Sequence, residues 1–148
     1  MNVWINNPFD NLPGEGRRPQ RYNLLCRALS KAGHRVVWWS SDFSHATKRP
    51  RRLEPVYRAP EGFEVRLVPT LPYRDNIGLR RAWSHRRYAA AWERLAVAAV
   101  EAGELPRPDL VLTSVLRNSW ISSAAMPVLP PLPVCWWLPC APSRATAA

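Results

Sequence analysis

The sequence predicts an α/β fold built on a doubly wound parallel sheet, with helices on both faces. Short apolar runs alternate with helical segments along the chain, an order typical of parallel strands joined by crossover helices. An apolar run at 2–6, a glycine-containing loop, an amphipathic segment at 19–32 and a second apolar run at 35–40 follow one another. This succession is that of a strand–helix–strand unit.

The segment 19–32 has the apolar spacing of a helix, and Gly33 follows it where a glycine commonly ends one. The flanking runs 2–6 and 35–40 contain β-branched and aromatic residues, which favour strands. The apolar side chains of the helix recur at intervals of three and four residues and form one face: Tyr22, Leu25, Cys26 and Leu29.

Three further elements continue the alternation. Residues 63–68 alternate weakly in polarity and predict a third strand, and the apolar run 109–113 predicts a fourth. Between them, residues 77–102 predict a long helix that ends at Gly103. The apolar stripe of this helix contains Tyr88, Trp92, Leu95, Ala96 and Ala99.

The order of these strands predicts where a ligand would bind. We expect the first strand to be central, with the second and third strands on one side and the fourth on the other. Ligands of doubly wound sheets bind at the carboxyl ends of the strands, beside the point where the strand order reverses. The loops at this edge are residues 7–18, 41–50, 69–76 and 114–119. The longer stretch 41–62 shows no clear period and is predicted as a loop.

The C-terminal segment differs in character from the rest of the chain. A helix is expected from about Ser119, but prolines crowd residues 127–148 and prevent a continued helix. Residues 134–138 have the composition of a fifth strand. We therefore expect one domain over residues 1–126. For 127–148 two interpretations stay open: a disordered proline-rich tail, or the product of a frameshift or truncation.

The formal net charge of +10 comes mostly from clustered arginines. Such a surface attracts phosphate groups, nucleic acid or an anionic membrane leaflet, although ordinary solvated arginines give the same composition. No apolar run is long enough to span a bilayer and no signal peptide is visible, so a cytoplasmic protein is expected. Its three cysteines have neither the number nor the spacing of a disulfide framework or a zinc site, and no metal is expected.

Two glycines before the first helix are candidates for contact with phosphate. Glycine lets backbone N–H groups approach an anion, and a helix N-terminus favours negative charge. Gly14 and Gly16, followed by Arg17, have this position. The loop matches neither the dinucleotide-binding fingerprint nor the P-loop. A phosphate or sugar contact and a simple turn are both open.

Polar residues after the second and third strands are candidates for binding an acceptor. Asp42, His45 and Lys48 offer a carboxylate, an imidazole and an ammonium group, which suit a polyol or a phosphate. Tyr73 offers a ring for stacking, and Arg74 a cation for phosphate. Simpler interpretations are also open: the segment around Tyr73 would be a turn that begins with a proline, and His45 would be a surface histidine without a functional role. Less specific candidates at this edge are Ser114, Arg117 and Asn118, whereas Ser84 and His85 are expected to be surface or packing residues.

The first part of the chain resembles glycosyltransferase family four, whose members have the GT-B fold. The typical opening of that family is a strand, a glycine-containing loop, a helix and a Gly-His pair before the second strand. The segments around Asp42 to Lys48 and around Tyr73 are similar to a bacterial subgroup acting on cell-surface polysaccharides. The resemblance covers residues 1–126, and the matching helix positions are Arg21, Leu25, Leu29, Gly33, His34 and Val36.

The resemblance implies a Rossmann-like N-terminal domain on the acceptor side of a GT-B enzyme. Such an enzyme transfers a sugar from a nucleotide-sugar to a glycan or lipid-linked acceptor, usually with retention and without a bound metal or cofactor. It would act in the cytoplasm or peripherally at the inner membrane face. Gly14, Gly16 and Arg17 would then face the donor, and Asp42, His45, Lys48, Tyr73 and Arg74 the acceptor.

No segment of the sequence matches the family's C-terminal carboxylate motif or its phosphate-neutralising basic pair. We therefore expect the chain to be a fragment without activity on its own, because half a cleft does not preorganise charge around a transition state. The alternatives are a basic nucleic-acid-binding protein, which the tryptophans in predicted strands make less favourable, and a standalone nucleotide-binding α/β module.

Overall fold

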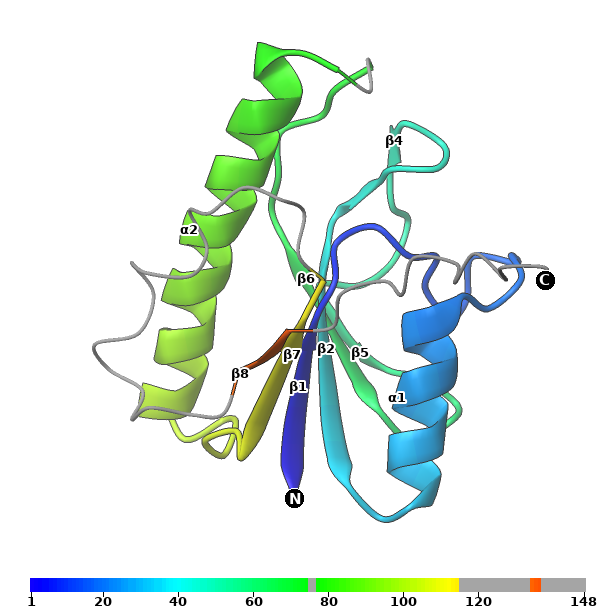
Figure 1. Cartoon of the computed structure of the whole chain (residues 1–148), viewed down its shortest axis with the longest axis vertical. Helices are drawn as coiled ribbons and strands as arrows, with labels where there is room; N and C mark the ends of the chain where they lie inside the picture. Colours follow the sequence, from blue (N-terminus) through cyan, green and yellow to red (C-terminus); the bar gives the residue numbers. More distant parts are fainter. Residues whose placement is uncertain (75–76, 115–133, 137–148) are drawn as a thin grey trace, which may run out of the picture.

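The computed structural model describes residues 1–74, 77–114 and 134–136, the last as backbone only. It is an α/β structure with one sheet and a helix on either side of it (Figure 1). The strands lie in the order β5-β6-β2-β1-β7-β8. The elements of this sheet and its helices are β1 (Asn2–Asn6), α1 (Arg21–Lys31), β2 (Arg35–Ser41), β5 (Val56–Arg58), β6 (Glu64–Val68), α2 (Leu79–Glu101), β7 (Leu110–Thr113) and β8 (Val134–Trp136).

The predicted order of the first four strands is confirmed. β1 pairs in parallel with β2 on one side and with β7 on the other, so that Val3 lies opposite both Val36 and Leu110. β6 pairs in parallel with the outer side of β2. Strands buried on both faces have apolar runs in the sequence, which is why β1 and β2 could be predicted as strands.

The prediction of a purely parallel sheet is wrong at one edge. The stretch predicted as a loop contains β5, which pairs antiparallel with β6 and makes the sheet mixed. A tight turn joins the two strands, with Ala59 N donating to Phe63 O and Gly62 at φ +91°. β5 has only three residues and is largely exposed, so it carries no apolar period. The same stretch contains the short hairpin β3 (Phe43–Ser44) and β4 (Arg49–Pro50).

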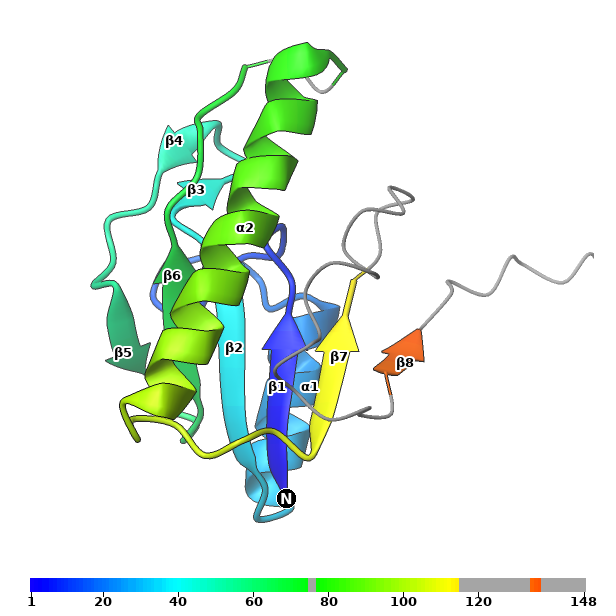
Figure 2. The same cartoon turned by 90° about the vertical axis from the view of Figure 1, so that its left-hand side faces the viewer.

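Each face of the sheet has its own apolar core. α1 covers the face that contains Trp38, and Phe63 packs there with Cys26, which is fully buried as expected. α2 covers the other face, which contains Trp4 and Trp39. Figure 2 shows α2 in front of the strands and α1 behind them. The alternation of side chains along β1 and β2 divides the tryptophans between the two faces.

α2 begins two residues later than predicted and is longer than the sheet is tall. Its buried stripe of Ser84, Tyr88, Trp92, Ala96 and Ala99 packs toward the sheet. The N-terminal turns of the helix project beyond the carboxyl ends of the strands (Figure 1). This projection leaves the first turns without sheet beneath them.

The predictions for the C-terminal part are only partly within the described residues. β8 falls inside the segment predicted as a fifth strand and pairs in parallel with β7. The helix expected from Ser119, the domain boundary at 126 and the character of 127–133 and 137–148 lie outside the described residues.

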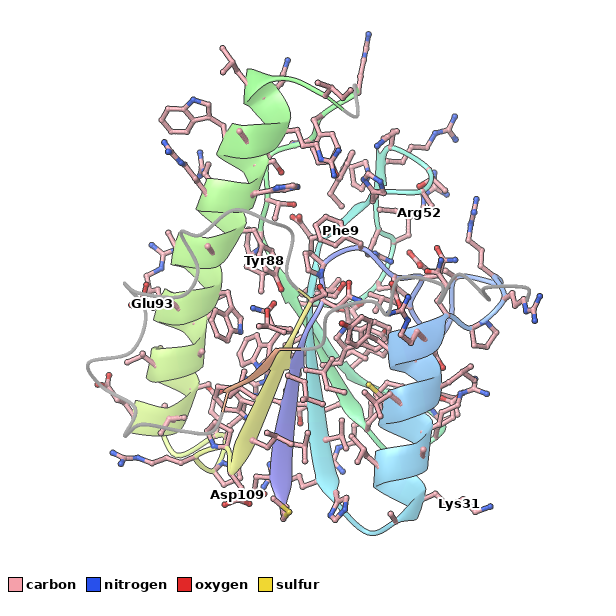
Figure 3. The ribbon with its side chains drawn as sticks, in the orientation of Figure 1. Phe9, Lys31, Arg52, Tyr88, Glu93 and Asp109 are labelled. Carbon is pink, nitrogen blue, oxygen red and sulfur yellow. The ribbon has the colours of Figure 1, made fainter. Side chains whose placement is uncertain are left out.

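One buried hydroxyl joins α2 to the two central strands. The Tyr88 hydroxyl donates to Asn6 Oδ1 at 2.5 Å and lies 3.2 Å from the Trp39 carbonyl oxygen. Figure 3 shows the Tyr88 side chain directed from α2 toward the strands. Burial raises the pKa of Tyr88 well above its ordinary value, so the group is a neutral donor.

We expect Tyr88→Phe to lower the free energy of unfolding by about 1–3 kcal/mol, because the buried amide oxygen of Asn6 loses its donor. Urea denaturation monitored by far-UV circular dichroism measures the change. A variant as stable as the parent chain would show that this hydroxyl does not hold α2 to the sheet.

Candidate functional site

Of the loops that were predicted to form the site, the described residues 7–18, 41–50, 69–74 and 114 follow strands that end at one edge of the sheet. β1, β2, β6 and β7 end at the same side, where the loops after β1 and β2 lie together (Figure 1). Arg51 connects these loops: its guanidinium contacts the Glu15 carboxylate at 2.6 Å, and its backbone N–H donates to the Asp42 carbonyl at 2.7 Å. The segments 14–16 and 42–48 therefore border the same edge.

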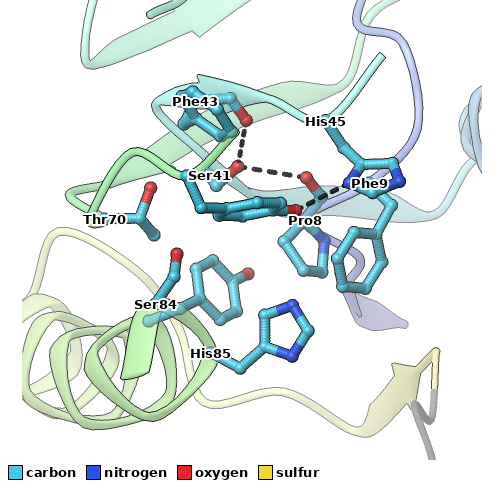
Figure 4. Close-up of a pocket in the computed structure, with 10 residues that line it drawn as sticks. Pro8, Phe9, Ser41, Phe43, His45, Thr70, Ser84 and His85 are labelled. Carbon is cyan, nitrogen blue, oxygen red and sulfur yellow. Dashed lines mark hydrogen bonds between the residues drawn. The ribbon is translucent and has the colours of Figure 1, made fainter. Parts of the chain in front are cut away.

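A small pocket of about 20 Å³ opens at this edge between the loops after β1, β2 and β6 and the N-terminal half of α2. Figure 4 shows Phe9, His45 and His85 around it, with Ser84 and Thr70 on the opposite side. The pocket is lined by Pro8, Phe9, Ser41, Phe43, His45, Thr70, Tyr73, Ser84, His85 and Tyr88. We call this the edge pocket.

Three of the predicted acceptor residues meet at the edge pocket. The Tyr73 hydroxyl lies 2.6 Å from His45 Nδ1, and Lys48 Nζ lies 3.3 Å from the same nitrogen. The Lys48 ammonium also lies 4.7 Å from the centre of the Tyr73 ring, a cation–π contact. Burial raises the pKa of Tyr73, so its hydroxyl stays protonated and can donate to His45.

His85 is the main residue that the sequence interpretation placed wrongly. It was expected to be a surface or packing residue, but its ring faces the edge pocket, 5.5 Å from the Phe9 ring and 6.3 Å from Tyr73. Its Nε2 is buried and has no hydrogen-bond partner among the described residues. The signal was present in the sequence, because His85 precedes Tyr88 by three residues and so continues the inward stripe of the helix. Ser84 is a packing residue as expected: its hydroxyl donates to Leu71 O.

Both histidines of the edge pocket have lowered pKa values. Burial is the largest cause for each, and nearby cations add to it: Lys48 and Arg81 for His45, and Arg81 for His85, with a smaller contribution from His45. The imidazoles are therefore neutral at pH 7. A neutral imidazole both donates and accepts a hydrogen bond, which suits the hydroxyl groups of a ligand.

Asp42 has a structural position rather than a place in the edge pocket. Its Oδ1 accepts hydrogen bonds from Thr70 N at 2.9 Å and from Thr70 Oγ1 at 2.7 Å. These bonds hold the loop after β6 against the loop after β2 and so position Tyr73. Arg74 is exposed and does not line the pocket.

The glycine loop does not line the edge pocket and instead contacts Leu53 and, through Pro13 O, the Tyr57 hydroxyl of β5. Gly14 and Gly16 have φ values of +89° and +66°, which side-chain-bearing residues rarely adopt, and both are exposed, as is Arg17. The Asp10 carboxylate accepts a hydrogen bond from Tyr22 N in the first turn of α1, so the chain supplies its own anion there. Ser114 N donates to Asn6 O at the end of β7, whereas Arg117 and Asn118 lie outside the described residues.

Comparison of the sequence with models of known protein families and with characterised proteins finds no match. The site is therefore interpreted from its own chemistry. Within residues 1–74 and 77–114, no three His, Cys, Asp or Glu side chains gather as a metal would need. Neither of the two described helices combines the length and apolar composition of a membrane span.

The lowered pKa values predict a loss of stability on mild acidification. In the unfolded chain a histidine binds its proton at about pH 6.5. Because the folded state holds both pKa values lower, the unfolded state binds more protons as the pH falls through that value, and the free energy of unfolding decreases. Urea denaturation at a series of pH values from about 7.5 to 5.5 measures this slope.

The double variant His45→Gln/His85→Gln should have a flatter dependence over the same range, because neither side chain then titrates. His34→Gln, altered at the opposite edge of the sheet, leaves the edge pocket intact and is the matched control. Equal slopes for the parent chain and the double variant would contradict the assignment.

The position of Asp42 predicts a stability effect with a specific rescue. Asp42→Ala removes the acceptor of both Thr70 hydrogen bonds and should lower the free energy of unfolding by about 1–3 kcal/mol. Asp42→Asn keeps an oxygen acceptor and should recover most of the loss. Thermal unfolding of the two variants tests this, and an Asp42→Ala chain of unchanged stability would rule out the tie between the loops.

Proposed function

We propose that this chain is the Rossmann-like, acceptor-side domain of a glycosyltransferase of family four with the GT-B fold. The complete enzyme would transfer a sugar from a nucleotide-sugar to a lipid-linked or polysaccharide acceptor, in the cytoplasm or peripherally at the inner membrane face. On its own, the described domain would bind acceptor without turnover, since the groups that hold a donor would come from elsewhere.

The observation that carries the proposal is the meeting of two separate sequence segments at one pocket. His45 and Lys48 follow β2, whereas Tyr73 follows β6, and the three side chains are in contact. The sequence around each of the two segments resembles the family separately, and neither similarity implies that the segments are in contact. Their convergence at the carboxyl edge of the sheet is what an acceptor site at this position requires.

The chemistry of the edge pocket suits a sugar. Neutral imidazoles of His45 and His85 can each hold a hydroxyl group, and the buried, unpartnered Nε2 of His85 is available to a ligand. The Phe9 ring adds an apolar surface of the kind that packs against the C–H face of a sugar.

The glycine loop borders the same carboxyl edge of the sheet but not the edge pocket. Gly14 and Gly16 are exposed there, and the Arg51–Glu15 ion pair fixes the loop that carries them. Exposed glycines there would let the donor or the reacting sugar approach the backbone closely. Because Asp10 already occupies the first turn of α1, we assign the donor phosphates to the side of the complete cleft that this chain does not provide.

Ligand titrations followed by NMR test the proposal. Short oligosaccharides and UDP- and GDP-sugars are added separately to the uniformly labelled chain. We expect oligosaccharides to shift the resonances of His45, Tyr73 and His85 and nucleotide-sugars to leave them unchanged. His85→Ala should weaken oligosaccharide binding about tenfold, the effect of losing one hydrogen bond to a partly buried group.

His34→Ala is the control for this experiment, because His34 is the remaining histidine and lies at the amino edge of the sheet. Binding that is equally weakened by His34→Ala would refute the assignment of the edge pocket, as would a full set of shifts from nucleotide-sugars alone.

A nucleic-acid-binding function receives less support. Among the tryptophans whose side chains the structure describes, Trp4, Trp38, Trp39 and Trp92 are buried in the two cores and unavailable for stacking on bases. Only Trp83 of this described set is exposed. A single exposed ring does not form the stacking platform that single-stranded nucleic acid needs.

A further inference from the structure

The projecting end of α2 exposes large apolar side chains. Ile77, Leu79 and Trp83 have exposed fractions of 90%, 83% and 59%. An exposed apolar side chain lacks the stabilisation that burial would give it. In the described part of the chain, the other exposed large apolar residues are isolated from one another, whereas these three form a group. A group of three within two turns of one helix indicates a binding surface.

Arginines surround these apolar side chains. Residues 77–92 contain no aspartate or glutamate, and their four arginines are Arg80, Arg81, Arg86 and Arg87. Arg80, Arg86 and Arg87 are exposed. The first acidic residue of α2 is Glu93, further along the helix and away from its projecting end (Figure 3).

Helical geometry places Leu79 and Trp83 on an outward face that arginines accompany. Leu79, Trp83 and Arg86 are spaced by four and three residues, so they lie along one side of the helix, opposite Tyr88 in the stripe that packs toward the sheet. The exposed side chains of Arg80 and Arg87 flank this side. We call Ile77, Leu79, Arg80, Trp83, Arg86 and Arg87 the tip surface.

We propose that the tip surface docks this domain on an anionic lipid bilayer. Tryptophan and leucine on one face of a helix enter the boundary between headgroups and acyl chains, and flanking arginines hold the anionic headgroups. The surface holds both kinds of group and no acidic residue, which complements a negatively charged leaflet. Self-association through the same surface is less favourable, because it would bring the arginines of two chains together.

Docking of the tip would place the edge pocket beside the membrane. Ser84 and His85 line the pocket from the same two turns of α2 that carry Trp83 and Arg87 on their outer side. A lipid-linked acceptor could then reach the pocket while its lipid stays in the bilayer. This role of the docking, to bring a lipid-linked acceptor to the pocket, rests on the proposed function. The docking itself can be measured without any glycan.

Flotation of the whole 148-residue chain with vesicles tests the docking. Vesicles of phosphatidylcholine alone are compared with vesicles that contain one third phosphatidylglycerol. We expect binding to the anionic vesicles only, with a marked loss in high salt. Trp83→Ser should weaken binding on the order of tenfold through lost apolar contact. Arg80→Gln/Arg87→Gln should weaken it about 25-fold, at about fivefold for each arginine.

Matched variants separate the tip surface from the overall charge. Arg35→Gln/Arg107→Gln removes the same charge from exposed positions at the opposite edge of the sheet, and Leu24→Ser removes an exposed leucine from α1. Both should bind vesicles as the parent chain does. Thermal unfolding of every variant checks that the fold is unchanged, which the exposure of these side chains leads us to expect.

Several results would overturn the proposal. These are absence of binding to anionic vesicles, equal binding by Trp83→Ser and the parent chain, and an equal loss in the Arg35→Gln/Arg107→Gln control. A dimer, seen by light scattering and abolished by Trp83→Ser, would instead assign the surface to self-association.

Oligosaccharide titrations on the same variants distinguish this proposal from the proposed function. His85→Ala should lose oligosaccharide binding and keep vesicle binding, and Arg80→Gln/Arg87→Gln should do the reverse. Vesicle binding without any oligosaccharide binding would leave the docking intact and refute the acceptor site.

Discussion

The arrangement of the candidate site depends on the hydrogen bond between the Tyr88 hydroxyl and the Asn6 side chain. Asn6 ends the central strand, so this bond fixes the height of α2 relative to the carboxyl ends of all its neighbours. His85 lies less than one helical turn before Tyr88, and its position over the edge pocket follows from that height. The same bond turns the side of α2 that contains Tyr88 toward the sheet, so that Trp83, on the opposite side of the helix, is exposed.

The strands that could be predicted from the sequence are those that are buried on both faces of the sheet, because burial on both faces requires apolar residues. The runs at 2–6 and 35–40 were recognisable as strands because each has an uninterrupted apolar centre, and nearly all of their residues are buried. β5 was not recognisable, because an exposed edge strand of three residues is held by its turn and by backbone pairing with β6, which leave no apolar period. The strand order followed from connectivity and chirality rather than from residue preference.

The location of the candidate site could be predicted from the sequence, but the residues that form it could only partly be predicted. Parallel strands bring their carboxyl ends to one edge, so the convergence of His45 with Tyr73 needed no knowledge of side-chain geometry. The role of Asp42 did need it, because a carboxylate at a strand end suits a ligand and a loop N–H equally well, and Thr70 takes it here. His85 was missed because a polar residue within a helix was interpreted from its type, although its spacing from Tyr88 already placed it on the inward side.

The high positive charge has two separate effects in this structure. Arg51 and Arg66 are largely buried and form ion pairs. Arg51 pairs with Glu15 and joins two loops, and Arg66 pairs with Glu64 of its own strand and with Glu104, which follows α2. Around the edge pocket, burial is the largest cause of the lowered pKa values of the two histidines, and cations add to it: Lys48 and Arg81 for His45, and Arg81 for His85. A positive rim around an uncharged lining attracts an anionic surface or ligand without placing a full charge inside the pocket. With that separation, one helix presents arginines outward, toward the membrane that we propose, and a hydrogen-bonding imidazole inward, toward the proposed sugar site.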